Sequence, residues 1–176
     1  FYHRNTNKTA YSRQACAEPI FFLPDGSIPQ VEITSTGLDA CPLKENKTYP
    51  AAICCNLTNG KMPHQGNGVI KKHVPFLSCE DGTCIVIAVK NTQICYKFFQ
   101  FTGGKASVLL RLRASSGGKL DIFADQTAAG SRTLSPSTTW QELTIPCDFP
   151  LGRHALSFAW HGSGEIHIQD FSVRVR

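Results

Sequence analysis

Trp140 is the side chain whose type and position most suggest a binding role. It follows serine, threonine and proline at residues 135–139, a composition typical of a loop. A tryptophan at the rim of a loop can serve as a flat platform for a ligand with an apolar face. The alternative is that Trp140 folds over the edge of a sheet and has only a packing role.

Eight cysteines are many for a chain of 176 residues. Cys79 and Cys84 flank an Asp-Gly turn, where a hairpin would place the two thiols opposite each other. This spacing predicts a local disulfide, and the alternative is a pair of free thiols in a reducing compartment. A zinc site is not supported, because the chain has no Cys-x-x-Cys pair.

Three Asn-x-Ser/Thr sequons, at Asn7, Asn46 and Asn56, are candidate glycosylation sites. Sequons also occur by chance, but here they accompany a disulfide-like cysteine spacing. Together these features predict a secreted, extracellular protein. The chain begins at Phe1 without a methionine, and we expect that a leader or a larger upstream piece precedes it.

The composition is that of a globular chain with a core, since 41% of the residues are hydrophobic and 18% are charged. The formal net charge of +5 is spread along the chain. No basic stripe is interleaved with aromatic residues, so we do not expect nucleic acid as a partner. No apolar run is long enough to span a bilayer, so we do not expect a membrane partner either.

The elements that must position Trp140 are strands, because apolar and polar residues alternate through most of the second half of the chain. Residues 138–147 and 154–160 read as two strands of an antiparallel sheet, joined by a turn. The apolar phase of the last strand changes between Ile168 and Phe171, which predicts a β-bulge at Gln169 and Asp170. Glycine and serine turns separate the further predicted strands, at residues 84–89, 94–101, 107–113, 120–124 and 166–175. This pattern predicts an all-β chain folded as a β-sandwich.

The first half of the chain is less regular. Residues 20–23 and 28–33 read as short strands around a Pro-Asp-Gly turn. Two or three strands cannot bury a core alone, so residues 1–37 must pack on another domain or complete a sheet that another chain provides. Prolines and glycines divide residues 38–78 into short pieces that are hard to read, and residues 49–57 are the one strand predicted there.

Residues 1–37 resemble the end of family 43 glycoside hydrolases, five-bladed β-propellers that cut xylose and arabinose linkages. The resemblance rests on a Tyr-His strand, a following Arg strand and a hairpin with Asp25, Gly26, Ile28 and Val31 in register. It implies that these are the closing-blade strands of an incomplete hydrolase domain, and that the catalytic carboxylates lie in blades outside this chain. We therefore expect no catalytic residues in the chain itself, and whether it forms part of an active enzyme stays open.

The same resemblance assigns roles to two further residues. His3 matches a final-blade histidine near a metal on the propeller axis, and Arg13 would face the active-site end of an intact propeller. The alternative for His3 is a histidine that simply lies beside a sheet. No cofactor is otherwise expected, and a calcium ion at the propeller axis is implied only if the remaining blades are present.

The second half of the chain resembles a family 6 carbohydrate-binding module, a jelly-roll β-sandwich. The matching motifs stand in unbroken order at residues 96–101, 112–120, 140–141 and 152–164. Such modules commonly follow family 43 catalytic domains, so the two resemblances support each other. They imply a family 6-like sandwich over residues 38–176, with 38–78 the poorly readable part.

This second resemblance implies a sugar site around Trp140 and His167. Trp140 matches the loop tryptophan on which these modules stack a sugar ring, and His167 stands where members keep an asparagine that bonds the sugar. The alternative for His167 is a solvent-facing strand residue. No aromatic stands near residues 86–88, where the family has its second stacking ring. A structural calcium is not expected, because Gln169 and residues 51–52 offer no carboxylate at the matching places.

Three functions are therefore open. The first is a non-catalytic accessory portion of a secreted glycoside hydrolase, which binds a plant-type polysaccharide or oligosaccharide such as xylan or arabinan. The second is a degenerate sandwich with a structural or assembly role. The third is a processed segment that completes an active glycosidase together with upstream blades or another copy of the chain.

Overall fold

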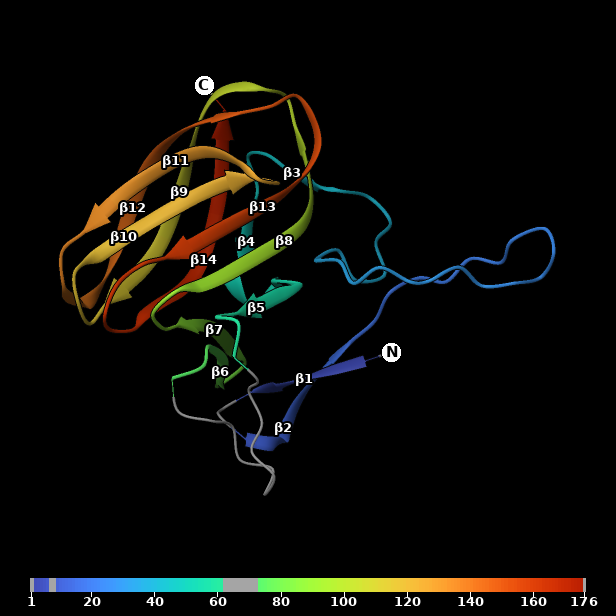
Figure 1. The fold of residues 1–176 in the computed structure, drawn as a ribbon, viewed down its shortest axis with the longest axis horizontal. Coiled ribbons are helices and arrows are strands. Elements are labelled where there is room, and N and C mark those ends of the chain that lie inside the picture. Colours follow the sequence, from blue (N-terminus) through green and yellow to red (C-terminus); the bar gives the residue numbers. More distant parts are fainter. Residues whose placement is uncertain (1, 7–8, 62–72, 176) are drawn as a thin grey trace.

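A computed structural model of the chain describes residues 2–6, 9–61 and 73–175, and for residues 2–14 and 80 it describes the backbone alone. Two β-sheets form the two layers of a sandwich, and the described residues contain no α-helix (Figure 1). The prediction of an all-β sandwich is confirmed.

The first sheet carries most of the residues that concern function. Its strands lie in the order β12-β9-β14-β7-β6-β1-β2, and β4 also pairs with β14. Their bounds are Ser137–Phe149 (β12), Gly104–Ala114 (β9), Ile166–Val175 (β14), Thr83–Ala88 (β7), Phe76–Glu80 (β6), Tyr2–Thr6 (β1), Thr9–Cys16 (β2) and Thr48–Pro50 (β4).

The second sheet covers the inner face of the first. Its strands lie in the order β11-β10-β13-β8-β3, and β5 also pairs with β8. Their bounds are Thr127–Leu134 (β11), Gly118–Ala124 (β10), Gly152–Trp160 (β13), Thr92–Phe101 (β8), Leu43–Lys44 (β3) and Asn56–Thr58 (β5), and a short 3₁₀ helix, η1, spans Ala51–Ile53.

Aromatic rings from both sheets meet in the core. Phe171 on β14 is 1% exposed, and its ring centroid lies 4.4 Å from that of Tyr96 and 5.3 Å from that of Phe158, both on the opposite sheet. Tyr96 and Trp160 are fully buried. Burial of large apolar side chains between two twisted sheets is the main stabilising contribution in such a fold.

The predicted bulge in the last strand is present. The pairing of β14 with β9 shifts register between Ile168 and Asp170. Ile168 and Phe171 are thereby both buried although they are three residues apart. The bulge leaves the first part of β14 with its odd-numbered residues facing outward.

Residues 49–57 do not form the single strand that the sequence predicted. The segment is divided into β4, η1 and β5, and it crosses from one sheet to the other, because β4 pairs with β14 and β5 pairs with β8. A continuous strand could not pair with both sheets. Ala51 and Ala52 are buried where the chain crosses between the layers.

The predicted strands at residues 20–23 and 28–33 are also wrong. Residues 17–38, which we call the arm, contain no strand and extend away from the sandwich (Figure 1). The Pro-Asp-Gly turn does form, since the Gly26 amide donates to the Leu23 carbonyl at 2.8 Å. The segment on either side finds no neighbouring strand among the described residues, so no ladder of backbone hydrogen bonds can form.

The arm is anchored to the sandwich at its C-terminal end. The Ser35 amide donates to the Lys97 carbonyl at 2.6 Å, and the Lys97 ammonium lies 2.8 Å from the Glu32 carboxylate. Most apolar side chains of the arm are nevertheless exposed, with exposed fractions between 40% and 70%: Ile20, Phe21, Phe22, Leu23, Ile28, Val31, Ile33 and Leu38.

Candidate functional site

Four neighbouring strands of the first sheet place one row of residues side by side on its outer face. His167 on β14 pairs directly with Arg113 on β9 and with Ile87 on β7. The preceding and following residues of β14, Ile166 and Ile168, are fully buried, so His167 points away from the core. We call Trp140, Arg113, His167 and Ile87 the Trp140 row.

Trp140 joins this row through an irregularity in its own strand. The pairing of β12 with β9 shifts register between Ser137 and Gln141, and Trp140 lies within that shift. Its ring centroid is 4.9 Å from the guanidinium carbon of Arg113, which is a cation–π contact. Trp140 is therefore held against the sheet by a charged neighbour and is only partly buried.

A chain of hydrogen bonds continues from Arg113. Its Nε and Nη2 lie 3.3 and 3.2 Å from Nδ1 of His167. Arginine can only donate, so Nδ1 of His167 accepts and the neutral ring carries its proton on Nε2. That nitrogen donates to a Glu165 carboxylate oxygen at 3.2 Å. The side chains of this row are thus oriented before any ligand arrives.

The Trp140 row borders an open pocket of about 530 Å³. Aliphatic and aromatic surface from Ile87 and Trp140 stands beside hydrogen-bonding groups from the other lining residues. The pocket is lined by Ser78, Asp81, Thr83, Ile85, Ile87, Arg113, Trp140, His167 and Gln169. A concave mixture of apolar and polar groups can bind a small polar ligand by stacking and hydrogen bonding.

The structure brings together Trp140 and His167, the two residues that the sequence predicted to bind sugar, in this one pocket. Ile87 lies where the family has its second stacking aromatic, which this chain lacks. Sequence reasoning did not identify Arg113, which contacts both predicted residues. The alternation of residues 107–113 indicates that Arg113 faces outward. Which residues of β12 and β14 lie beside it depends on the strand register, which the sequence does not show.

The described part of the structure does not test the roles that the resemblance assigns to His3 and Arg13. Their backbones lie in β1 and β2, where His3 pairs with Ala15 and Arg13 with Asn5, and their side chains are outside the described part of the structure. Their assigned roles stay predictions.

The candidate glycosylation sites differ in their surroundings. Asn46 and Asn56 are both exposed. The side-chain oxygen of Asn46 accepts from the Val175 amide at 3.3 Å, whereas Asn56 is in β5, where it pairs with Cys95. Asn7 lies outside the described residues.

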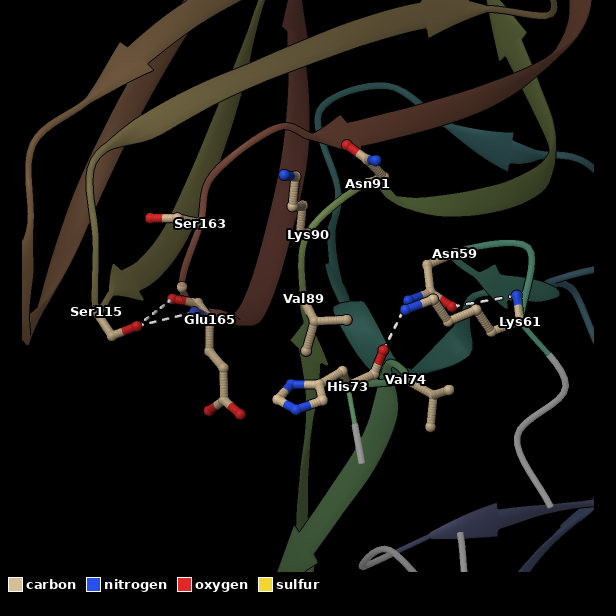
Figure 2. Close-up of a pocket in the computed structure, with 11 residues that line it drawn as sticks. Asn59, Lys61, His73, Val74, Val89, Lys90, Asn91, Ser115, Ser163 and Glu165 are labelled. Atoms are coloured by element: carbon tan, nitrogen blue, oxygen red, sulfur yellow. Dashed lines mark hydrogen bonds between the residues drawn. The ribbon is translucent and has the colours of Figure 1, made fainter. Parts of the chain in front are cut away.

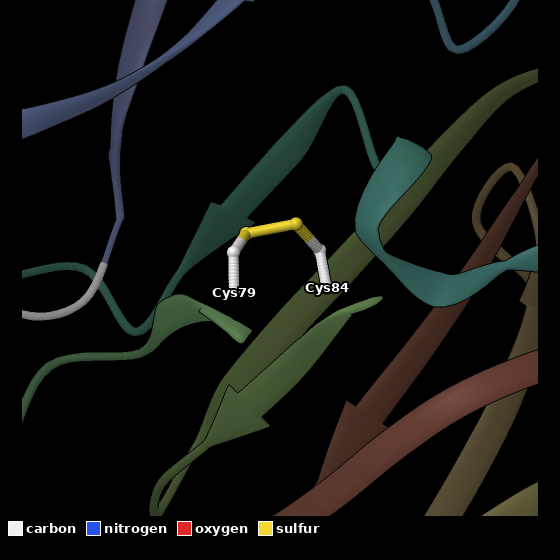
Figure 3. Close-up of a disulfide and its surroundings, with 2 residues drawn as sticks. All are labelled: Cys79 and Cys84. Atoms are coloured by element: carbon white, nitrogen blue, oxygen red, sulfur yellow. A yellow bond between two sulfur atoms is a disulfide. The ribbon is translucent and has the colours of Figure 1, made fainter. Parts of the chain in front are cut away.

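The predicted disulfide between Cys79 and Cys84 is confirmed (Figure 3). It joins β6 to β7 across the Asp-Gly turn, and Asp81 and Gly82 both have positive φ angles, of 49° and 78°. Asp and Gly are among the residues that adopt this conformation most readily. The disulfide closes the hairpin that supplies one wall of the Trp140 pocket.

The residues at the expected place of the family's calcium do not suit a hard cation. Ala51 and Ala52 offer no side-chain oxygen, and Gln169 lines the Trp140 pocket. The neighbouring carboxyl, Asp170, has a raised pKa because burial disfavours its charge, with a smaller contribution from Glu142. Among the described residues, no group of three or more His, Cys, Asp or Glu side chains could hold a metal ion.

A second pocket, of about 480 Å³, lies at the end of the same strands (Figure 2). Its most orderly part is a pair of hydrogen bonds at the start of β14, where the amide of Ser115 donates to the Glu165 carbonyl and the Ser115 hydroxyl accepts from the Glu165 amide, both at 2.8 Å. The pocket is lined by Asn59, Lys61, His73, Val74, Val89, Lys90, Asn91, Ser115, Ser163, Gly164 and Glu165.

In the described part of the chain, no helix is long and apolar enough to cross a membrane.

Comparison with known proteins identifies relatives among carbohydrate-active enzymes. No family model matches the chain. A protein named xylosidase/arabinosidase from Thermoclostridium stercorarium is 33% identical over 185 residues, an alignment that covers 98% of this chain and 39% of the relative. The chain thus spans about two fifths of the length of this curated relative.

Two solved structures show the same fold. A family 43 arabinoxylan arabinofuranohydrolase from Bacillus subtilis, solved with cellotetraose, superposes with a TM-score of 0.60 at 15% identity, over 90% of this chain and 33% of the enzyme. A family 6 carbohydrate-binding module from Clostridium cellulolyticum, solved with xylose, superposes with a TM-score of 0.57 at 17% identity, over 76% of this chain and all of the module. The predicted resemblance to a family 43 C-terminal part with a family 6-like module is confirmed.

Proposed function

We propose that this chain is a non-catalytic accessory portion, from the C-terminal part of a glycoside hydrolase, that binds plant-type polysaccharide of the xylan or arabinan kind. The relative named xylosidase/arabinosidase and the fold shared with family 6 carbohydrate-binding modules support this proposal. The observation that carries this proposal is the Trp140 row, which places an aromatic ring and oriented polar groups around one pocket.

The chemistry of the row suits a sugar ring. A pyranose has a face of C–H groups that packs on an aromatic plane, and Trp140 offers that plane with little loss of side-chain freedom. The Nε2–H of His167 and the remaining N–H groups of Arg113 can donate to hydroxyl oxygens, while Gln169 can both donate and accept. Binding of this kind holds a catalytic domain near an insoluble substrate and raises its effective concentration there.

Arg113 limits where a sugar can stack, because its guanidinium already covers part of the Trp140 ring. A sugar either stacks on the other face of the ring or displaces the guanidinium. With Ile87 in place of a second aromatic, the ligand has one stacking surface, and we expect weak binding that depends strongly on Trp140.

The arm supports a second role, in assembly. The arm exposes eight large apolar side chains. Single exposed apolar residues are normal on a protein surface, whereas a large group of them marks an interaction site. We propose that the arm packs against the catalytic part of the same polypeptide, because the chain accounts for only 39% of its relative's length and 33% of the Bacillus enzyme. The Bacillus enzyme also matches 90% of this chain where the isolated Clostridium module matches 76%, which supports a link between the additional residues and the enzyme.

We also propose that the protein works outside the cell. The Cys79–Cys84 disulfide and the exposed Asn46 and Asn56 sequons support an oxidising, secretory environment. Mass spectrometry of the protein secreted by its native host would test this, with glycan mass on Asn56 as the expected result.

Affinity gel electrophoresis tests the sugar-binding proposal. The chain should be retarded in gels that contain xylan or arabinoxylan, and a β-glucan gel tests specificity. Trp140→Ala should remove the retardation, whereas Leu151→Ala, which changes another exposed apolar side chain, should not. Absence of retardation, or retardation that survives Trp140→Ala, would reject stacking on Trp140 and leave the assembly role.

A further inference from the structure

A second row of residues lies beside the Trp140 row on the same face of the sheet. Val89 and Ser115 follow Ile87 and Arg113 by two positions. On the antiparallel strand β14, Glu165 precedes His167 by two positions. Residues two positions apart on a strand share a face and lie roughly 7 Å apart. The hydrogen bonds between Ser115 and Glu165 extend the pairing of β9 with β14 to this second row.

The two pockets meet at one contact. Glu165 lines the second pocket, and its carboxylate accepts from His167, which lines the first. A ligand longer than one sugar ring that stacks on Trp140 and continues past His167 therefore enters the second pocket.

The second pocket has an excess of positive charge. Lys61 and Lys90 both line it and are exposed, and neither has an ion-pair partner among the described residues. Among the described lining residues the single carboxylate belongs to Glu165, and it already accepts a hydrogen bond from His167. An ammonium group without a protein partner at a concave surface favours an anionic ligand.

We propose that this second pocket is a subsite for an acidic sugar, a uronic acid unit next to the sugar held at Trp140. The inference rests on the proposed sugar-binding function and names its substrate class as uronic acid-bearing xylan. Lys61 and Lys90 pair with the uronate carboxylate, while Asn91 and Ser163 are placed to bond its hydroxyl groups.

Isothermal titration calorimetry with two defined probes tests the proposal. One is unsubstituted xylotetraose, and the other is xylotetraose that carries one glucuronic acid unit. The chain should bind the acidic probe about fivefold more tightly at low salt, and the preference should shrink as salt rises. The double variant Lys61→Gln/Lys90→Gln should bind both probes equally.

A matched control removes two exposed lysines from another part of the molecule. Lys44→Gln/Lys47→Gln makes the same change in net charge and should keep the preference for the acidic probe. Equal binding of both probes by the unchanged protein, with binding lost in Trp140→Ala, would overturn the acidic subsite alone. Failure of both probes to bind would overturn the subsite and the sugar-binding function together.

Discussion

Phe171 and Phe22 are the same residue type in opposite environments. Phe171 is 1% exposed between the two sheets, whereas Phe22 is 69% exposed on the arm. The sandwich buries its aromatic side chains within the chain, and the arm presents them outward. The difference shows that the sandwich buries its own core, and it is the basis of our proposal that the arm packs against another part of the protein.

Truncation of a core ring should have the largest effect on stability. Phe171→Ala removes a ring that contacts Tyr49, Tyr96, Phe99 and Phe158. We expect a loss of about 3–5 kcal/mol in the free energy of unfolding, because the cavity lies where two sheets meet and cannot collapse. Urea denaturation of the chain measures it, and a loss below about 1 kcal/mol would contradict the packing described here.

Removal of the disulfide should have the next largest effect. Cys79→Ser/Cys84→Ser opens a short loop, for which chain-entropy arguments give a loss of about 2 kcal/mol. Since the hairpin forms a wall of the Trp140 pocket, sugar affinity should fall as well. Denaturation with and without reductant gives the stability change, and identical unfolding curves would show that the bond does not constrain the fold.

The ion pair between His154 and Asp125 should make a small, pH-dependent contribution. The hydrogen bond to Asp125, at 2.7 Å, raises the pKa of His154. Burial opposes ionisation of Asp125, but hydrogen bonds from His154 and from the Ala155 amide outweigh it and lower the pKa of that carboxyl.

The sign of the pH effect follows from these directions. The raised His154 pKa means that its contribution is complete below its unfolded pKa of about 6.5 and is lost as the pH rises through the folded pKa. The lowered Asp125 pKa means that its contribution is present above about pH 3.9 and is lost as the pH falls through the folded pKa. Because Asp125 is 52% exposed, we expect less than about 1 kcal/mol. His154→Gln should flatten the change in unfolding free energy between pH 5 and 8, and an unchanged slope would argue against this pair.

Substitution of the arm should have the smallest effect on the chain by itself. Phe21→Ser/Phe22→Ser alters two exposed rings, so the free energy of unfolding should stay within about 0.5 kcal/mol. The same variant should weaken association with a separately produced catalytic part, measured by size-exclusion chromatography. A large loss of stability, or unaltered association, would remove the contrast between arm and sandwich.

Much of the sandwich could be predicted from sequence, because its strands alternate clearly. Val108, Leu110 and Leu112 are buried at alternate positions of the strand predicted at residues 107–113, and the bulge after Ile168 was visible as a change of phase. β11 was not predicted, since its residues 127–134 are mostly small or polar and lie on an edge strand. The arm was predicted as strands because alternation alone does not reveal whether a partner strand exists.

The candidate site was predictable only in part. Trp140 and His167 were identified from motif positions, and the structure places both in one pocket. Arg113 was missed because its contact with Trp140 depends on the shifted register of β12 against β9, which spacing along the chain does not give. The second row was missed for the same reason, since Ser115 and Glu165 meet only once two distant strands are paired.

Tryptophan fluorescence tests whether a sugar stacks on Trp140. The chain has two tryptophans, and Trp160 is fully buried while Trp140 is accessible, so quenching by acrylamide reports mainly on Trp140. Addition of xylo-oligosaccharide should protect Trp140 and lower the quenching constant. Quenching that stays unchanged under conditions where the same sugar binds the chain would show that the sugar does not stack on Trp140.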